Sequence, residues 1–226
     1  MAERRGRPQL TKERVLTGAV ALADDRGMDG FTIRRLAAAL DTKPMTIYYH
    51  VPNKEAIIDG MVDIVFNEIE LPPPDLDWKD AIRIRYLSAR QTLNRHPWAP
   101  PLMESRHSPG PGTLRHHDAV LGCFRRGGLS IELTAHAYAI LDSYLYGFAM
   151  EEAMLPSGQS GELTDMAEEM LGAFREHYPH LYELTTQHVL RDGYSFGNSF
   201  EFGLDLIIES LNQRVQTGTT ADMGAR

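Results

Sequence analysis

The sequence predicts an all-α protein, and three observations lead to that class. Apolar residues recur at intervals of three and four along most of the 226-residue chain, as the buried face of a helix requires. The alternation of apolar and polar residues that marks a strand is nearly absent. Hydrophobic residues make up 42% and charged residues 24%, which provides enough apolar material for a folded core. We therefore expect a small N-terminal helical part followed by a larger one.

Capping residues divide the N-terminal part into successive helices. Thr11 suits the N-cap of a first helix that ends near Gly27. A second, short helix follows Thr32, and a third begins at 43–44, where a proline fits the first helical turn. A fourth helix is expected over 54–71, with a regular apolar face.

A proline run at 71–75 separates the C-terminal part, because it cannot be helical and acts as a stiff spacer. Five prolines and two glycines indicate an extended connection over 97–112. Helices are predicted over about 78–93, 113–126, 130–154, 163–176 and 199–215. The predicted divisions of the chain are a domain over 1–54, a connecting helix over 55–71, a second domain over 72–216 and a disordered tail over 217–226.

Several classes of protein are excluded by what the sequence lacks. No run of 18 apolar residues exists, so no membrane-spanning helix or membrane partner is expected. The basic N-terminus is not followed by the apolar stretch of a secretory signal. The single cysteine, Cys123, forms no internal disulfide and is flanked by apolar residues, as an inert thiol would be. A cytoplasmic protein fits these features.

Charge is distributed unevenly along the chain. Residues 1–54 hold ten Lys and Arg against six acidic residues, a balance of +4. Residues 55–226 hold thirteen basic and twenty-five acidic residues, a balance of −12. A small basic module on an acidic body indicates a binding site for an anionic partner near the N-terminus.

Residues 32–54 have the layout of a helix-turn-helix, two short helices about three residues apart. The second helix would enter the major groove of double-stranded DNA, where Pro44 and Met45 suit a thymine methyl group. Arg34 suits a guanine edge, and Lys54 suits a phosphate. The alternative is an ordinary helical hairpin with exposed tyrosines. The predicted DNA contacts are Thr32, Arg34, Lys43, Pro44, Met45, Thr46, Tyr48, Tyr49, His50 and Lys54.

Two stretches of this region, 31–37 (FTIRRLA) and 46–54 (TIYYHVPNK), resemble the signature of the TetR family of bacterial transcriptional regulators. The segment 200–208 (FEFGLDLII) is similar to the last helix of the tetracycline-repressor subclass. The resemblance implies a three-helix DNA-binding head and a larger helical ligand-binding and dimerisation domain. It also implies a homodimer on a palindromic operator, regulated by a small-molecule effector. The family usually has a glycine at the position of Asp41, and aspartate tolerates a left-handed backbone better than most residues.

The resemblance does not extend to the site at which the subclass binds its metal–tetracycline complex. The corresponding positions hold Glu70, Arg85, Ala89, Met103 and Ser143, which lack the expected chelating groups, and of the set only Glu151 is retained. We therefore expect a different effector. The predicted ligand-binding residues are Tyr86, Trp98, Met103, His117, Leu121, Tyr138 and Asp142. Core packing is the alternative for the aromatic residues, and an arginine partner on a helix edge is the alternative for Asp142.

Apolar stripes on the helices over 130–154 and 199–215 allow two interpretations, a buried core or a surface that packs a second copy of the chain. The predicted dimer contacts are Tyr144, Phe148, Phe200, Leu204, Ile207, Ile208 and Leu211.

No cofactor, metal site or enzymatic activity is expected. The closest histidine pairs, at 116–117 and 177–180, lack the spacing of metal ligands on a helix. The prediction is a ligand-responsive repressor. The alternatives are an activator of the same fold, a small-molecule-binding protein that does not read DNA, and a metal-dependent enzyme.

Overall fold

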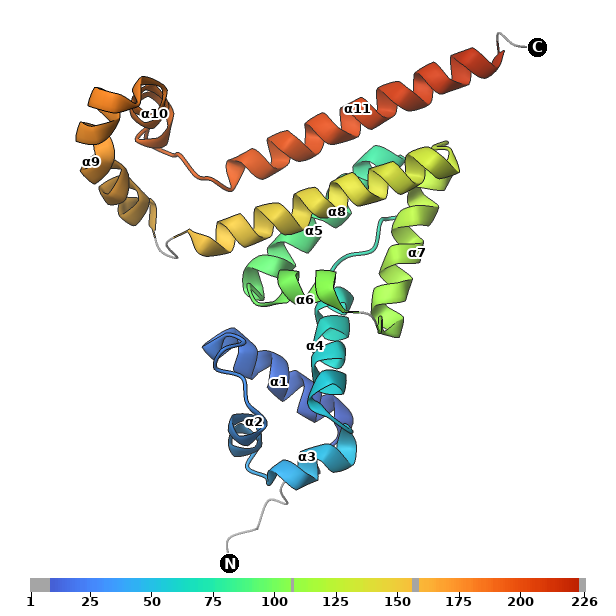
Figure 1. The fold of residues 1–226 in the computed structure, drawn as a ribbon. Coiled ribbons are helices and arrows are strands. Elements are labelled where there is room, and N and C mark those ends of the chain that lie inside the picture. Colours follow the sequence, from blue (N-terminus) through green and yellow to red (C-terminus); the bar gives the residue numbers. More distant parts are fainter. Residues whose placement is uncertain (1–8, 107, 156–158, 224–226) are drawn as a thin grey trace, which may run out of the picture. The chain divides into compact units, whose positions relative to one another are not determined.

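The computed structural model describes residues 9–106, 108–155 and 159–223 of the chain, and within them every regular element is a helix (Figure 1). The all-α prediction is therefore confirmed. The helices are α1 (Lys12–Arg26), α2 (Ile33–Ala39), α3 (Pro44–His50), α4 (Lys54–Glu68), α5 (Trp78–Arg95), α6 (Ala99–Ser105), α7 (Pro111–Arg126), α8 (Ile131–Met154), α9 (Gln159–His177), α10 (Pro179–Leu184), the π-helical segment η1 (Thr185–Val189) and α11 (Asn198–Met223). None of the described helices is long and apolar enough to span a lipid bilayer.

The chain folds into two compact units, and each unit is built from two separate stretches of the sequence. The first unit contains the described residues up to Leu71 and returns to include Gln91–Gly122. The second contains Pro72–Arg90 and the described residues from Cys123 onward. The proline run at 71–75 thus marks one of the crossings, as its composition suggests. The sequence gives no sign that the chain crosses back within α5 and again within α7.

In the first unit, α1 packs against α2, α3 and α4. The caps form where the sequence predicts them: Thr11 Oγ1 accepts a hydrogen bond from the Arg14 amide at 3.1 Å, and Gly27 ends α1 with a φ of 65°. Asn53 caps α4 through a 2.7 Å bond to the Ala56 amide. These caps satisfy backbone groups that the helix ends would otherwise leave without partners.

The segment 96–117 is tied to α1 and α4 by side chains that lie far apart in the sequence. Asp24 of α1 accepts hydrogen bonds from the Trp98 indole at 2.6 Å and from His96 Nδ1 at 2.7 Å. Arg106 Nε donates to Asp59 of α4 at 2.6 Å, and its guanidinium also pairs with Glu55. The first unit therefore contains the three-helix head and α4, held together with the end of α5, α6 and most of α7.

The expectation of an extended connection over 97–112 is wrong, because α6 forms within it. Proline breaks a helix in its interior but is tolerated in the first turn, where no intrahelical partner is lost. Pro100 and Pro101 occupy that turn in α6, and Pro111 is the first residue of α7. A high proline content therefore marks helix starts here.

In the second unit, α8 and α11 run alongside each other (Figure 1). Two arginines of α5 join these helices. Arg90 makes a bidentate pair with Glu152 of α8, at 2.9 and 2.5 Å. Arg83 bonds to Asp205 of α11 at 2.8 Å and to Glu201 of α11 at 2.6 Å. Bidentate pairs of this kind fix orientation as well as adding energy.

The C-terminal elements are longer than the sequence indicates. Helices α10 and η1 occupy 179–189, where none was predicted, and they pack against each other and against α9. Pro179 lies at the first position of α10, where it does not interrupt a helix. Helix α11 continues to Met223, past the expected end at 215. Residues 217–223 are therefore helical, where we expected a disordered tail. Residues 224–226 lie outside the described part of the chain.

Candidate nucleic-acid interface and ligand sites

Local sequence sets the geometry of the helix-turn-helix. The Thr32 hydroxyl accepts a hydrogen bond from the Arg35 amide at 3.2 Å and so begins α2. Lys43 occupies the N-cap position of α3, with Pro44 in its first turn. Between the helices, Asp41 adopts a φ of 49°, the left-handed conformation for which a glycine is usual. Aspartate tolerates this backbone, so the departure from the family pattern leaves the turn intact.

The inward side of this hairpin fixes α3 on the head. Leu36 and Ile47 are fully buried, and Val51 and Phe31 are nearly so. This cluster holds α2 against α3 and leaves the opposite side of α3 to solvent.

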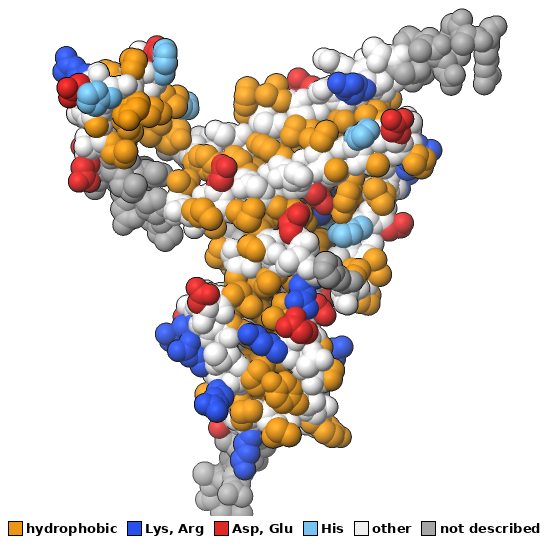
Figure 2. Space-filling model, in the orientation of Figure 1, with side chains coloured by type: hydrophobic (Ala, Val, Ile, Leu, Met, Phe, Trp, Pro, Cys, Tyr) orange, Lys and Arg blue, Asp and Glu red, His pale blue; other side chains and the backbone are white. Residues whose placement is uncertain are grey.

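All ten predicted DNA contacts lie on the solvent side of the head. Nine are exposed and His50 is half-buried beside the Tyr49 ring, with ring centroids 5.2 Å apart. Met45 is 77% exposed and Tyr49 86%, so both side chains are accessible to a partner. Lys and Arg side chains gather over the end of the molecule that carries α1–α3 (Figure 2). The basic residues Arg4, Arg5 and Arg7 fall outside the described part of the chain.

The two adjacent arginines of α2 have different environments. Arg35 Nη1 donates to the Gly30 carbonyl at 2.8 Å, which ties α2 to the preceding turn. Arg34 is exposed and forms no hydrogen bond or ion pair with the described residues, so its guanidinium is available to a partner. Lys54 is also exposed, with its ammonium 5.8 Å from the centroid of the Phe31 ring.

Two of the predicted ligand-binding residues, Met103 and His117, line a cavity of about 120 Å³ in the first unit. The walls come from α4, α6, α7 and the segment between the last two. The lining residues are Asp59, Val62, Phe66, Met103, Arg106, Ser108, Pro109, Gly110, Thr113 and His117. This volume is below that of a typical ligand site, so the cavity suits a small group.

Trp98 and Leu121 do not line this cavity. The Trp98 side chain is buried and its indole N–H is bonded to Asp24, which is a structural role. Leu121 is 37% exposed on α7.

The other three predicted ligand-binding residues, Tyr86, Tyr138 and Asp142, meet in the second unit. The Tyr86 hydroxyl donates to Asp142 Oδ1 at 2.8 Å, and both side chains are buried. Burial raises the pKa of Tyr86 well above its usual value, and the Asp142 carboxylate raises it further. The same two causes raise the pKa of Tyr138. Both phenols therefore stay protonated and act as donors.

Sequence reasoning did not assign Arg85 to this cluster. Its side chain is 1% exposed, and its Nη1 lies 3.9 Å from Asp142 Oδ1. The sequence does place this arginine directly before Tyr86, a predicted ligand-binding residue, and that proximity could have indicated its role. The arginine expected as one alternative for Asp142 is therefore present, but beyond hydrogen-bonding distance.

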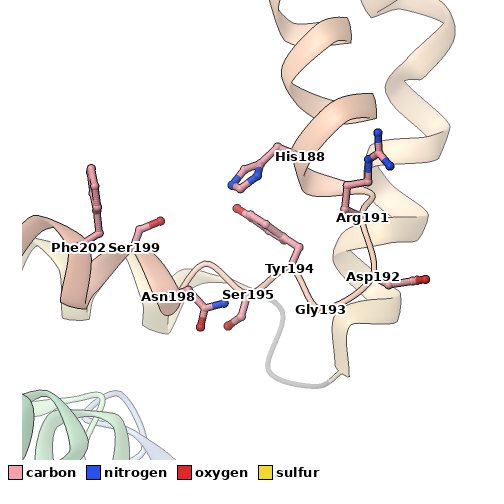
Figure 3. A pocket seen from close by; sticks show the side chains of 9 residues that line it. All are labelled: His188, Arg191, Asp192, Gly193, Tyr194, Ser195, Asn198, Ser199 and Phe202. Carbon is pink, nitrogen blue, oxygen red and sulfur yellow. The ribbon is translucent and has the colours of Figure 1, made fainter.

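A further groove, of about 540 Å³, lies between η1, the loop that follows it and the start of α11. His188 and Tyr194 face each other there, with ring centroids 5.1 Å apart (Figure 3). Phe202 lines its α11 side and is 69% exposed. We did not expect this groove from the sequence, because it depends on η1, which was not predicted either.

The predicted dimer contacts are mostly buried inside the single chain. Phe148 of α8 and four residues of α11 have exposures of 8% or less, so their side chains form the α8–α11 core and cannot present a surface to a second copy. The four are Phe200, Leu204, Ile208 and Leu211. Ile207 and Tyr144 are half-buried, and the Tyr144 hydroxyl donates to the Ser199 and Phe200 carbonyls.

Of the two interpretations of these stripes, the buried core therefore holds for most of the residues. The exposed apolar side chains described on α8 and α11 lie at other positions, namely Ile131, Ile140, Met154, Phe202 and Leu206. A period of 3.6 shows that a stripe exists but not which of two adjacent stripes faces inward.

Comparison with known proteins agrees with this arrangement. The model of bacterial regulatory proteins of the tetR family matches residues 15–61, and that of the tetracyclin repressor-like C-terminal domain matches residues 71–215. The HTH-type transcriptional repressor DrrR1 of Streptomyces coeruleorubidus is 32% identical, over 91% of this chain and 78% of its own length.

The crystal structure of apo ActR from Streptomyces coelicolor superposes with a TM-score of 0.77 at 25% identity, covering 93% of this chain and 99% of ActR. The structure of ActR in complex with actinorhodin gives the same TM-score at 26% identity, covering 92% of this chain and 99% of ActR. The two family models together cover both the helix-turn-helix and the helices that follow it. The chain belongs to the tetR family of bacterial transcriptional regulators.

Proposed function

We propose that this chain is a ligand-responsive repressor that binds a palindromic operator as a homodimer and is released by a small-molecule effector other than tetracycline. The observation that carries the proposal is the outer side of the helix-turn-helix. It combines an exposed guanidinium at Arg34, exposed apolar groups at the tip of α3 and hydroxyl groups along it. These groups match base edges, thymine methyls and phosphates respectively.

A homodimer is supported by the exposed apolar residues of α8 and α11. Phe202 and Leu206 lie one turn apart on α11, and Ile140 is exposed on the neighbouring α8. In a two-fold dimer these residues would pack against their counterparts. The two α3 helices would then enter successive major grooves about 34–36 Å apart.

Release by an effector is supported by the way α4 is held in the first unit. The cavity beside Met103 is bounded by Val62 and Phe66 of α4. Its rim contains the bonds from Arg106 to Asp59 and from the Thr113 amide to Asp63, at 2.6 and 2.8 Å. An effector group that enters the cavity would shift these bonds and with them α4, which leads directly from α3.

Such a shift would change the population of states in which both α3 helices fit one operator. The ligand complexes of ActR with actinorhodin and (S)-DNPA support a small-molecule effector for this chain as well.

The proposal is tested by capturing sheared genomic DNA from the source organism on the purified protein and sequencing what is retained. We expect enrichment of a palindrome. The matched control is Tyr49→Glu, which places a negative charge on a side chain that is 86% exposed and therefore leaves the core intact. Equal recovery of all sequences by both proteins would contradict the proposal.

A further inference from the structure

A buried cation with unmet hydrogen-bond donors lies between α5 and α8. Arg85 is 1% exposed, and neither its Nε nor its Nη1 has a hydrogen-bond partner in the part of the chain that the structure describes. A guanidinium remains protonated under all physiological conditions. Buried N–H groups are nearly always paired, so these two nitrogens are an exception that requires a cause.

The carboxylate of Asp142 does not fill this role. Its Oδ1 accepts the Tyr86 hydroxyl at 2.8 Å, while Arg85 Nη1 is 3.9 Å from the same atom. Tyr138 also hydrogen-bonds to Asp142. Asp142 thus balances the charge of Arg85, but it gives Nη1 no hydrogen bond at this distance.

Arg85 also lies near the phenols of Tyr86, Tyr138 and Tyr146. Its guanidinium carbon lies 4.5 Å from the centroid of the Tyr86 ring, which is fully buried. Ala89, one turn along α5, and Leu141 and Leu145 of α8 are fully buried as well. Two buried donors of Arg85 therefore have no acceptor among the described residues, so an incoming acceptor oxygen would satisfy them and an incoming donor would not.

We propose that Arg85 binds an anionic oxygen of the effector, a carboxylate or an ionised phenol on an otherwise apolar aromatic molecule. This inference rests on the proposed ligand-responsive function and adds the chemical class of the ligand. The anion would accept hydrogen bonds from Arg85 Nε or Nη1 in a region of low dielectric, where charge-assisted bonds are strongest. Asp142 and Tyr86 would hold the guanidinium in place.

The test is isothermal titration of the full-length protein with matched acids and amides of increasing size. The probes are benzoate and benzamide, 2-naphthoate and 2-naphthamide, and anthracene-2-carboxylate and its amide. We expect the acid to bind at least tenfold more tightly than its amide for the pair that binds best. If no pair shows this preference, including the case in which nothing binds, the proposal is overturned.

Two variants separate ligand binding from structure. Arg85→Met replaces the guanidinium with an apolar chain of similar length, and we expect it to lose the preference for acids while its melting temperature stays the same or rises. Arg83→Met is the matched control, since it removes the same charge two residues away on the exposed side of α5. Retention of the preference in Arg85→Met would overturn the proposal.

If Arg85→Met does not fold, Asp142→Asn decides the question. Asparagine still accepts a bond from Tyr86 but removes the competing negative charge, so acids should bind several-fold more tightly. Unchanged or weaker binding of acids would contradict the proposal. Operator binding without ligand should be unaffected in the folded variants, so a failure here is distinguishable from a failure of the proposed DNA-binding function.

Discussion

The carboxylate of Asp24, in the first helix of the head, accepts a 2.6 Å hydrogen bond from the indole of Trp98, 74 residues further along the chain. His96 Nδ1 donates to the same oxygen at 2.7 Å, and its Nε2 lies 3.1 Å from Glu68 Oε2 of α4. One small polar cluster thus joins α1, α4 and the start of α6. It explains why the segment 91–122 belongs to the same compact unit as the helix-turn-helix.

Removal of the indole donor should weaken this unit. Trp98→Phe retains an aromatic ring but leaves Asp24 with His96 alone, and we expect it to lower the free energy of unfolding by about 1–2 kcal/mol. In an Asp24→Ala background the same substitution should cost clearly less, because the hydrogen bond is already absent. Urea denaturation of the four proteins measures this coupling. Equal costs in both backgrounds would show that Trp98 contributes only by packing.

The cluster should also make part of the protein's folding stability sensitive to acid pH. Burial raises the pKa of Glu68, but hydrogen bonds from Arg95 and His96 outweigh this effect and lower it from 4.5. A lowered carboxyl pKa contributes stability that is fully present above pH 4.5 and is lost as the pH falls through the lowered pKa.

Glu68→Gln should therefore destabilise the protein at pH 7, and the difference from the unmodified chain should shrink below pH 4.5. Thermal melting across this range is the measurement. Glu169→Gln, on an exposed face of α9, serves as a control. A difference that is the same at every pH would show that Glu68 acts through shape and not through charge.

The exposed side of the helix-turn-helix gives a prediction about base and phosphate contacts. Arg34→Ala should reduce operator affinity by about 1–3 kcal/mol and relax the preference at one base pair, because the exposed guanidinium can contact a guanine. Lys54→Ala should weaken binding to all sequences alike and reduce the salt dependence. Fluorescence anisotropy on an operator series at several salt concentrations separates the two. A uniform loss in Arg34→Ala would reassign it to the phosphate backbone.

The burial of α11 makes a prediction about assembly. Leu206→Glu changes a side chain that is 52% exposed, and it should convert a dimer to a folded monomer. Ile208→Glu places a carboxylate in the core, where Ile208 is 5% exposed, and should unfold the protein instead. Sedimentation equilibrium with circular dichroism distinguishes these results. If Leu206→Glu remains dimeric, the dimer interface does not include Leu206 and lies elsewhere on the chain.

The head was predictable from the sequence because its structure is set locally. Thr11, Thr32 and Asn53 cap helices through bonds to amides three residues ahead. The turn at Asp41 has a positive φ, a backbone conformation that aspartate adopts more readily than most residues. Caps and turns of this kind depend on adjacent residues, so pattern and position suffice to find them.

The ligand sites and the dimer surface were harder to predict because they depend on contacts between distant segments. The roles of Trp98 and Arg85 depend on Asp24 and Asp142, 74 and 57 residues away in the sequence. On α11, adjacent apolar stripes at Ile208 and Leu206 are equivalent until the packing of α8 buries one of them. Periodicity gives neither kind of information.

The central claim is that two copies of α3 read one operator at a fixed spacing, and equilibrium binding to three duplexes tests it most directly. The duplexes carry the enriched palindrome, the same half-sites moved apart by about five base pairs, and a scrambled sequence. Half a helical turn of extra spacing places the half-sites on opposite faces of the DNA. We predict that the spaced duplex binds no more tightly than the scrambled one. Equal affinity for all three duplexes would contradict sequence reading by α3, and equal affinity for the two that contain half-sites would contradict a rigid dimer.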